Sequence, residues 1–353
     1  MILVVNAGSS SIKVELFDEH LTAILQGKVT EIGGKARIKL GTLDQPAFAP
    51  DHKAAFKTIL QALAAQGHPA EALTGAAHRI VHGGELHDPV RLTDAVMTQI
   101  EGYNPLAPLH NPHNLSAIRA LAALVPDLPQ YASFDTAFHA GNAPLVTTYA
   151  IPQSERDKGI RRYGFHGLSY ASLVEALGPS LPRRLLALHL GNGSSLCAIV
   201  DGKSVASSMG YSPVEGLVMG TRPGAFDSMA VLRLAQDYGI DATIKMLNKD
   251  CGLKGLGGTN DMVQLLATDA PEAHFAIEHY CYWAAREAGS AIVAMGGIDA
   301  IAFTGGIGEN AEPIRTRILQ HLAFLGDLPV HVVPADEERQ IARDALNLIA
   351  AGR

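Results

Sequence analysis

The sequence predicts an α/β protein of two related halves, and a repeated pattern is the main reason. Residues 2–17, ILVVNAGSSSIKVELF, form an apolar segment, a Gly/Ser-rich bend and a second apolar segment, and residues 185–200, LLALHLGNGSSLCAIV, do the same. Two apolar runs around a short Gly-containing bend are typical of a β-hairpin. The return of this unit half a chain later indicates two duplicated domains, each opening with a phosphate-sized turn and facing each other across a cleft.

Length and helical spacing support the same class. A chain of 353 residues with 47% hydrophobic content is larger than one core usually organises. Apolar spacing near 3.6 follows each hairpin and indicates that helices alternate with strands in both halves. The predicted helices span residues 53–66, 112–125, 169–177, 228–238, 271–295, 312–325 and about 335–350. Asn111 is the expected cap of the second helix, and turn residues such as Gly141 and Pro144 mark the boundary between the halves.

Composition excludes several classes of protein. The formal net charge is −7, and no run of Lys or Arg exceeds a pair, so nucleic acid is not an expected partner. The cysteines Cys197, Cys251 and Cys281 form no C-x-x-C pair, which argues against disulfides or a thiolate zinc site and fits a reducing compartment. No stretch of about 18 residues is apolar and free of charges and breaks, as a membrane span requires. We therefore expect a cytoplasmic protein with no membrane contact.

Three Gly-rich segments follow apolar runs and predict contacts to phosphate. They are residues 6–13, NAGSSSIK, residues 191–195, GNGSS, and residues 305–310, GGIGEN. Together they offer small side chains, free N–H groups and one lysine, Lys13, as a polyphosphate requires. The spacing matches neither the Walker A nor the Gly-x-Gly-x-x-Gly pattern, so neither a P-loop nor a Rossmann site is indicated.

Two other motifs suggest chemistry that their surroundings do not support. Ser10-x-x-Lys13 resembles the nucleophile motif of β-lactamases, but the companion Ser-Asp-Asn and Lys-Thr-Gly motifs are missing. His78 and His82 would share one face of a strand with no third ligand evident nearby, so a structural or substrate role is favoured over zinc. His113 is expected to be a first-turn helix residue.

Two arginines lie in apolar surroundings. Arg79 lies within AAHRIV, and Arg222 follows GLVMGT. Burying a guanidinium without an anionic partner is costly, so each arginine predicts an anion. The simplest partner is a buried Asp or Glu. Next to the phosphate turns, however, we favour clamps for a substrate carboxylate and a transferring phosphoryl group.

The motifs together resemble a known family. NAGSSSIK, HRIVHGG, APLHNP, FDTAFH, YGFHGLS, HLGNGSS, SPVEGLVMGTRPG, FTGGIGEN and VVPADEE occur from residue 2 to about residue 342 in the order found in acetate kinases and their propionate kinase relatives. The resemblance implies two duplicated domains of the actin and sugar-kinase (ribonuclease H-like) ATPase fold with a nucleotide cleft between them. Residues 1–140 would form the N-terminal domain, with a C-terminal helix of about 338–353 packing back on it, and residues 141–337 the nucleotide-binding domain.

The implied activity is reversible, direct in-line transfer of the γ-phosphoryl group of ATP to acetate or propionate, giving the acyl phosphate and ADP. The family is usually homodimeric. By position, Asn6 and Glu337 would hold Mg²⁺ or Mn²⁺, and the catalytic set would be Asp135, His166 and Arg222. The substrate would contact Arg79, Val81, Leu109, His110, Phe165 and Pro213. The nucleotide ATP or ADP would contact Lys13, His189, Leu190, Gly191, Asn192, Gly193, Asp261, Met262, Val263, Gly306, Ile307, Gly308, Glu309 and Asn310.

Elementary chemistry refines these roles. A carboxylic acid has a pKa of about 4 to 5, so the nucleophile is already ionised near neutral pH and needs no general base. Asp135 is then better placed as an organiser of Mg²⁺ or its waters. A loose phosphoryl transition state spreads negative charge over its equatorial oxygens, and His166 and Arg222 are suitable donors to that charge.

The sequence also departs from the family pattern. The chain is short, most visibly over residues 31–52, and Ala225, Val263 and Tyr170 stand where an acidic residue, an arginine and a histidine are usual. Loss of the arginine weakens the expected contact to the base. Alternatives are therefore a carboxylate kinase with a longer acyl substrate or another phosphoryl donor such as pyrophosphate, or a non-kinase actin-like ATPase module. A module of that kind would need no carboxylate clamp.

Overall fold

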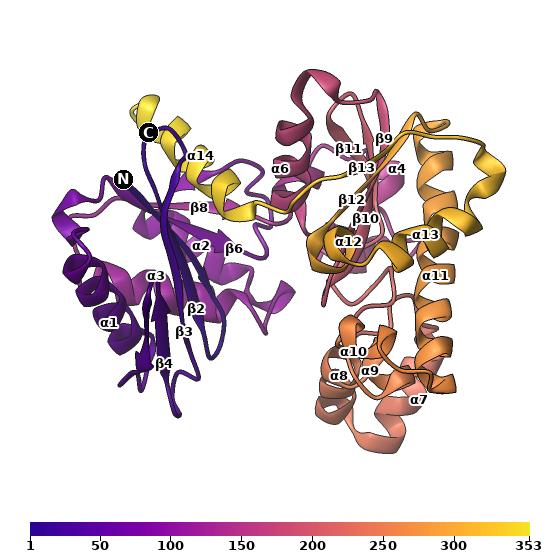
Figure 1. Cartoon of the computed structure of the whole chain (residues 1–353), viewed down its shortest axis with the longest axis horizontal. Helices are drawn as coiled ribbons and strands as arrows, with labels where there is room; N and C mark the ends of the chain where they lie inside the picture. Colours follow the sequence, from indigo (N-terminus) through magenta and orange to yellow (C-terminus); the bar gives the residue numbers. More distant parts are fainter. The chain divides into compact units, whose positions relative to one another are not determined.

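A computed structural model describes all residues 1–353 and divides the chain into two compact units. Unit 1 comprises Met1–Ala137 and Asp336–Arg353, and unit 2 comprises Phe138–Ala335. Each unit contains one mixed β-sheet with helices against it (Figure 1). The end of the chain therefore returns to the unit in which the chain begins.

Unit 1 is built on an eight-stranded sheet in the order β5-β4-β3-β2-β1-β6-β8-β7. The strands are β1 (Ile2–Ala7), β2 (Ile12–Phe17), β3 (Ala23–Thr30), β4 (Arg37–Leu40), β5 (Leu43–Pro46), β6 (Gly75–Ile80), β7 (Val90–Arg91) and β8 (Gln130–Phe134). Leu3 and Val5 of β1 share a core with α1 (His52–Ala65) and α3 (Asn111–Ala122), and α2 (Asp94–Gly102) packs on α3. The helix α14 (Glu337–Ala350) packs on β1, β6 and β8 but does not join that core. Because side chains alternate between the two faces of a strand, α14 covers the opposite face of the sheet.

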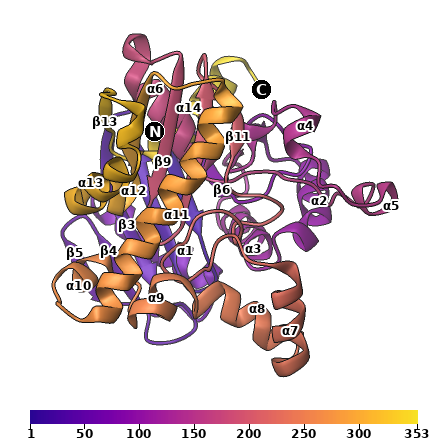
Figure 2. The same cartoon turned by 90° about the vertical axis from the view of Figure 1, so that its right-hand side faces the viewer.

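Unit 2 is built on a five-stranded sheet in the order β11-β10-β9-β12-β13. The strands are β9 (Arg184–Leu190), β10 (Ser194–Val200), β11 (Lys203–Ser207), β12 (Ala300–Thr304) and β13 (Val330–Val332). Leu186 and Leu188 of β9 face the long helix α11 (Pro271–Met295), which runs across the sheet (Figure 2), whereas Leu185 and Ala187 face α6 (Gly167–Leu177). Both faces of β9 are thus buried, which explains its continuous apolar run.

The remaining helices of unit 2 are mostly short. They are α4 (Pro144–Thr147), α5 (Gln153–Arg156), α7 (Ser228–Tyr238), α8 (Ile240–Lys249), α9 (Gly252–Gly257), α10 (Met262–Leu266), α12 (Gly305–Asn310) and α13 (Glu312–His321). Along the whole chain, in both units, short 3-10 turns occupy Ala70–Ala72, Asn104–Leu106, Ala137–His139, Gly178–Ser180 and Ala323–Leu325. None of the helices combines the length and the apolar character that crossing a membrane requires.

The two sheets share one topology. The order β3-β2-β1-β6-β8 in unit 1 corresponds strand for strand to β11-β10-β9-β12-β13 in unit 2. In both, the first three strands are antiparallel and the last three are parallel. The prediction of two duplicated α/β halves, each opening with the same hairpin, is therefore confirmed.

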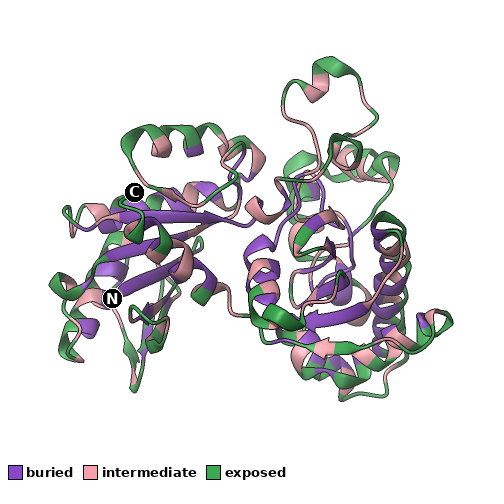
Figure 3. Ribbon diagram, turned by 90° about the horizontal axis from the view of Figure 1, so that it is seen from above, coloured by how far each residue is buried: buried purple, intermediate pink, exposed green.

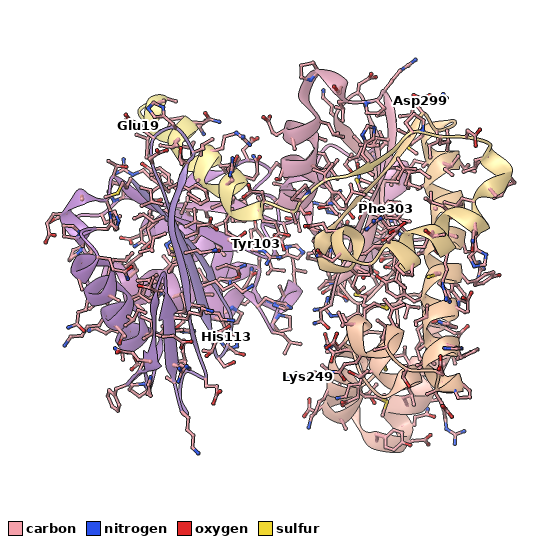
Figure 4. The ribbon with its side chains drawn as sticks, in the orientation of Figure 1. Glu19, Tyr103, His113, Lys249, Asp299 and Phe303 are labelled. Atoms are coloured by element: carbon pink, nitrogen blue, oxygen red, sulfur yellow. The ribbon has the colours of Figure 1, made fainter.

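Burial follows the sheets (Figure 3). The central strands are almost wholly buried in each unit, and exposed residues lie mainly on loops and outer helix faces. Phe303 of β12, labelled in Figure 4, is fully buried in the core beneath α11. The core of each unit thus holds the ends of its central strands in fixed positions.

Three local predictions are wrong. Residues 305–310, expected to form a Gly-rich loop, form the helix α12, in which only Gly305 has a positive φ, of 78°. Asn111 was expected to cap α3 but lies inside that helix, where it is fully buried and binds the backbone of His82. The predicted strand through His82 also ends earlier, at Ile80.

Candidate functional site

Three charged side chains meet in unit 1. Arg79 lies near the end of β6, Asp135 directly follows the parallel strand β8, and Glu337 begins α14. Arg79 donates from Nε to Oδ1 of Asp135 at 2.9 Å and from Nη2 to Oδ2 at 2.7 Å, and its Nη1 lies 3.6 Å from Oε2 of Glu337. The Asp135 side chain is 3% exposed and that of Glu337 15%. Arg79 therefore has the buried acidic partner that the simplest interpretation predicted.

Burial and charge pairing shift the pKa values of this cluster. Burial raises the pKa of Glu337, with Asp135 adding to the shift and Arg79 and Lys13 opposing it. Burial alone would lower the pKa of Arg79, but Asp135 and Glu337 outweigh it and raise that pKa, so the guanidinium stays charged. Two carboxylates thus contact the guanidinium of Arg79, and Lys13 adds a second positive charge near Glu337.

The oxygen donors of this cluster fit a magnesium ion. Asn6 lies on the face of β1 that α14 covers, as the alternation along β1 requires, and Lys13 is its register partner on β2. Mg²⁺ prefers carboxylate and amide oxygens and usually keeps several waters, so Asn6 and Glu337 are a chemically sufficient protein set. No group of three or more His, Cys, Asp or Glu side chains is arranged to hold a metal. Nε2 of His78 is hydrogen-bonded to Gln130, and burial lowers the pKa of His78 to about 4, so this histidine is structural.

Two asparagines in the first turn of α3 hydrogen-bond to the β1–β2 turn region and to the segment after β6. Asn114 donates to the carbonyl of Ala7 at 2.7 Å, and Asn111 donates to the carbonyl of His82 at 2.9 Å. Nε2 of His52 on α1 lies 2.9 Å from the carbonyl of Gly8. These side-chain contacts fix the β1–β2 turn and the segment after β6. Sequence reasoning missed them, although the polar run HNPHN is the signal that could have found them.

The other predicted substrate residues of unit 1 flank these bends. Val81 directly follows β6 and is half-buried, and Leu109, 47% exposed, precedes His110 at the start of α3. Phe165 and Pro213 belong to unit 2, where Phe165 is buried and Pro213 half-buried. Each unit therefore carries part of the predicted acyl contact set.

A neighbouring carboxylate gives a first testable prediction. Burial raises the pKa of Glu15 on β2 to about 7, helped by Glu338 and Asp336 and opposed by Arg339. A folded-state pKa above the unfolded value of 4.5 means that stability falls as pH rises through this window. Glu15→Gln should therefore stabilise the protein by about 1 kcal/mol at about pH 8, a value reduced for partial exposure, and leave it unchanged at about pH 4. Urea unfolding in metal-free buffer measures this.

The matched control is Glu19→Gln, which removes an exposed carboxylate near the end of the same strand. It should leave stability unchanged at both pH values. A gain for Glu15→Gln that is equal at both pH values would contradict the prediction.

Two histidines stack beside the β9–β10 turn of unit 2. His166 precedes α6 in a left-handed conformation with φ of 58°, and its ring lies 4.2 Å from that of His189 with an interplanar angle of 27°. Nδ1 of His166 is 2.9 Å from Oγ of Ser195, and Nδ1 of His189 is 2.8 Å from Oγ of Ser169. Both rings are thus oriented by serine hydroxyls.

Arg222 reaches the same turn from a different segment. Its Nη1 donates to the carbonyl of Pro213 at 3.1 Å. A Cβ built on Gly193 would lie 3.1 Å from Nε2 of His166 and 3.6 Å from Nη1 of Arg222, so both donors line the space above that glycine. Ala225 is exposed. The arrangement presents a guanidinium and an imidazole nitrogen at one glycine turn, as stabilisation of an anion requires.

A cavity of about 540 Å³ lies between the β9 end, α10 and α12. This volume is within the range of small-molecule sites. Predicted nucleotide residues that line it are Gly191, Asn192, Asp261, Met262, Val263, Gly306, Ile307 and Asn310, and residues that the sequence did not predict are Asn260, Leu266, Ala267, Ala311 and Pro313. The predicted residues that do not line it are Lys13 of unit 1 and His189, Leu190, Gly193, Gly308 and Glu309.

Polar contacts shape this cavity. Asn260 donates to Oδ1 of Asn192 at 2.9 Å, and Asp261 caps α10 by accepting from the amide of Val263 at 2.9 Å. The side chain of Leu190 is fully buried in the core, which leaves only its backbone for a ligand. Glu309 accepts from the amide of Ala335 at 2.8 Å, so it supports the chain leading into α14.

The sequence was compared with known families and proteins. The model of the Acetokinase family matches residues 1–345. An acetate kinase of Rhizobium meliloti is 41% identical over 99% of this chain and 98% of its own length.

Solved structures give a similar result. The crystal structure of Porphyromonas gingivalis acetate kinase superposes with a TM-score of 0.91 at 33% identity and covers 99% of both chains. A propionate kinase from Francisella tularensis superposes with a TM-score of 0.93 at 34% identity, covering 97% of this chain and 98% of its own. The similarity extends over both units.

Proposed function

The chain belongs to the Acetokinase family, and from this premise we propose how its residues carry out phosphoryl transfer. The enzyme is an acetate kinase, a phosphotransferase that moves a phosphoryl group between ATP and a small carboxylate. The match of one family model to residues 1–345 is the observation that carries this conclusion. The roles of individual residues, the metal, the assembly and the location follow as proposals.

We propose that Arg79 binds the substrate carboxylate. Asp135 occupies its Nε and Nη2 donors, so the carboxylate would approach from the Nη1 side, where Glu337 lies 3.6 Å away. Asn6 and Glu337 would hold Mg²⁺, which supplies positive charge to the transferring phosphoryl group. A cation on Glu337 would compete with Arg79 for that carboxylate and so leave Arg79 freer to bind substrate. Asp135 would orient the guanidinium and organise metal-bound water, with His110 nearby.

We propose that His166 and Arg222 stabilise the charge that develops on the phosphoryl oxygens. Both donors line the space above Gly193, and neither has to take up a proton, because the carboxylate nucleophile is already ionised. The nucleotide would occupy the cavity between α10 and α12. The acyl tail would contact Val81, Leu109, Phe165 and Pro213, whose apolar side chains suit a short chain.

We also propose a cytoplasmic homodimer. The nucleotide-binding domain expected at residues 141–337 would be unit 2, Phe138–Ala335, because Asp336 and Glu337 belong to unit 1. The absence of disulfide bonds among the three free cysteines fits a reducing compartment. Sedimentation analysis at several protein concentrations would measure the assembly directly.

Trapping of the acyl phosphate with hydroxylamine tests the function. Formate, acetate, propionate and butyrate are each supplied with ATP and Mg²⁺, and acyl hydroxamate is measured. We expect product with acetate, a smaller or similar yield with propionate, and little with butyrate. No product with any acid, despite ATP binding, would overturn the assignment, and product only with pyrophosphate as donor would support the alternative donor.

The exposed position of Val263 gives a second prediction. Val263 is 75% exposed on α10 and lines the nucleotide cavity. Val263→Arg should lower KM for ATP by about three- to tenfold without changing kcat, because a guanidinium stacks on or donates to a base. The control is Val293→Arg, since Val293 is 81% exposed on α11 and does not line this cavity. An unchanged KM for ATP in Val263→Arg would place the base elsewhere.

A further inference from the structure

A buried tyrosine extends the contacts of His166. Tyr170 lies four residues after His166, one turn into α6, and its side chain is fully buried. Its hydroxyl is 2.5 Å from Oγ of Ser195, which is also fully buried and lies 2.9 Å from Nδ1 of His166. Tyr170, Ser195 and His166 therefore form one chain of hydrogen bonds that leads from the core to the candidate site.

The direction of each hydrogen bond between Tyr170, Ser195 and His166 is constrained. Burial raises the pKa of Tyr170 well above 10, so the phenol stays protonated, and the hydrogen-bond partner of its hydroxyl is Oγ of Ser195. The phenol proton is thus available to Ser195. Having accepted it, Ser195 has one hydroxyl proton of its own to donate to Nδ1 of His166. Nδ1 is then an acceptor, which leaves the proton of a neutral imidazole on Nε2.

Nε2 is also the nitrogen that faces the candidate site. It is the atom nearest to a Cβ built on Gly193, and Nη1 of Arg222 lies beside the same point. Charged and titratable groups near His166 include Arg222 and the stacked His189, together with Tyr170 behind Ser195.

We propose that Tyr170 and Ser195 are positioning residues that hold His166 as the Nε2–H tautomer and aim that donor at the transferring phosphoryl group. The proposal rests on the role given to His166 above and extends it to the two buried residues that link this histidine to the core. A histidine can also donate to Ser195, so the position specifies a donor rather than a tyrosine. The pair contacts no substrate and acts through His166.

The chain contains a matched control for this pair. Tyr280 of α11 is equally buried, and its hydroxyl lies 2.9 Å from Oγ of Ser194, the residue before Ser195 on β10. Because neighbouring residues of a strand point to opposite faces, the Tyr280–Ser194 pair lies on the far side of the sheet from His166. Tyr280→Phe and Tyr170→Phe therefore remove the same hydroxyl from similar surroundings, and only Tyr170→Phe affects the chain to His166.

Steady-state kinetics on the full-length enzyme test the proposal first. Tyr170→Phe should lower kcat about tenfold and Ser195→Ala about a hundredfold, with KM for ATP and acetate within about twofold of wild type. The double variant should match Ser195→Ala, since both act in one chain. Tyr170→His should restore most of kcat, and Tyr280→Phe should leave kcat within about twofold. Equal losses in Tyr170→Phe and Tyr280→Phe would overturn the proposal.

Long-range ¹H–¹⁵N spectra of the imidazole rings supply a readout that does not depend on activity, with the His166 signals identified by their loss in His166→Gln. We expect the Nε2–H tautomer in wild type and Tyr280→Phe, and a mixture of tautomers in Tyr170→Phe and Ser195→Ala. The same tautomer in all four proteins would overturn the proposal. Failure of wild type to form acyl phosphate would instead contradict the proposed function and leave the tautomer result to stand alone.

Discussion

Replacement of Arg222 by alanine is expected to lower kcat for acyl phosphate formation by about a thousandfold while ATP still binds. Arg222 lies beside His166 above the Gly193 turn and is anchored by the carbonyl of Pro213, so its loss removes a fixed positive charge from the place where we propose that charge develops on the phosphoryl oxygens. It is not among the residues that line the nucleotide cavity. Hydroxylamine trapping measures kcat, and ATP binding is measured by calorimetry on the same protein.

An exposed arginine outside the candidate site serves as the control for Arg222→Ala. Arg233 on α7 is exposed and pairs with Asp237 one turn later, so Arg233→Ala should leave kcat unchanged. Arg222→Lys keeps the charge but not the planar fork, and should recover only part of the rate. Activity of Arg222→Ala within about tenfold of wild type would exclude Arg222 from the chemical step.

Replacement of Arg79 by leucine is expected to destabilise unit 1 by about 3 to 5 kcal/mol and to abolish transfer to acetate. The substitution leaves Asp135 and Glu337 buried without their common cation, and an uncompensated buried charge is costly. Stability is measured by urea unfolding followed by circular dichroism. The double variant Arg79→Leu/Asp135→Leu should be more stable than Arg79→Leu, because it removes one of the two stranded carboxylates.

A surface pair in the same unit provides the control. Arg37 and Asp44 join β4 and β5 through Nε and Oδ1 at 2.6 Å, but their side chains are 52% and 47% exposed. Arg37→Leu should therefore cost about 0 to 1 kcal/mol. If Arg79→Leu and Arg37→Leu are equally destabilised, the buried cluster does not contribute the stability that its geometry predicts.

Local sequence patterns predicted the larger elements of this fold. The apolar run of β9 indicated a strand of a hairpin, and the period of α11 was readable over its whole length of 25 residues. The helix α12 was missed because GGIGEN has a composition typical of a turn. Gly305, at the start of this helix, has a positive φ of 78°, and a Cβ built on it would lie 2.8 Å from the carbonyl oxygen of Leu190, so the entry into the helix depends on glycine.

The site was predicted less completely than the strands that carry it. Motifs identified Arg79 and Asp135 as functional candidates, and for Arg79 a substrate clamp was favoured over a buried ion pair. The structure shows the ion pair, formed across 56 positions of sequence. Similarly, Tyr170 appeared in the sequence only as a departure from the family pattern, and its bond to Ser195 emerged from the packing of α6 on the sheet.

The sequence by itself determined the duplication, the strand and helix periods, the family and the residue types available for chemistry, because these are written in local order and spacing. The tertiary structure alone decided which of those residues are partners: Arg79 with Asp135 and Glu337, and His166 with Ser195 and Tyr170. Such pairs depend on strand register and on helix packing over long sequence separations. Strand register and helix packing are set by burial of the whole core, and no local pattern encodes them.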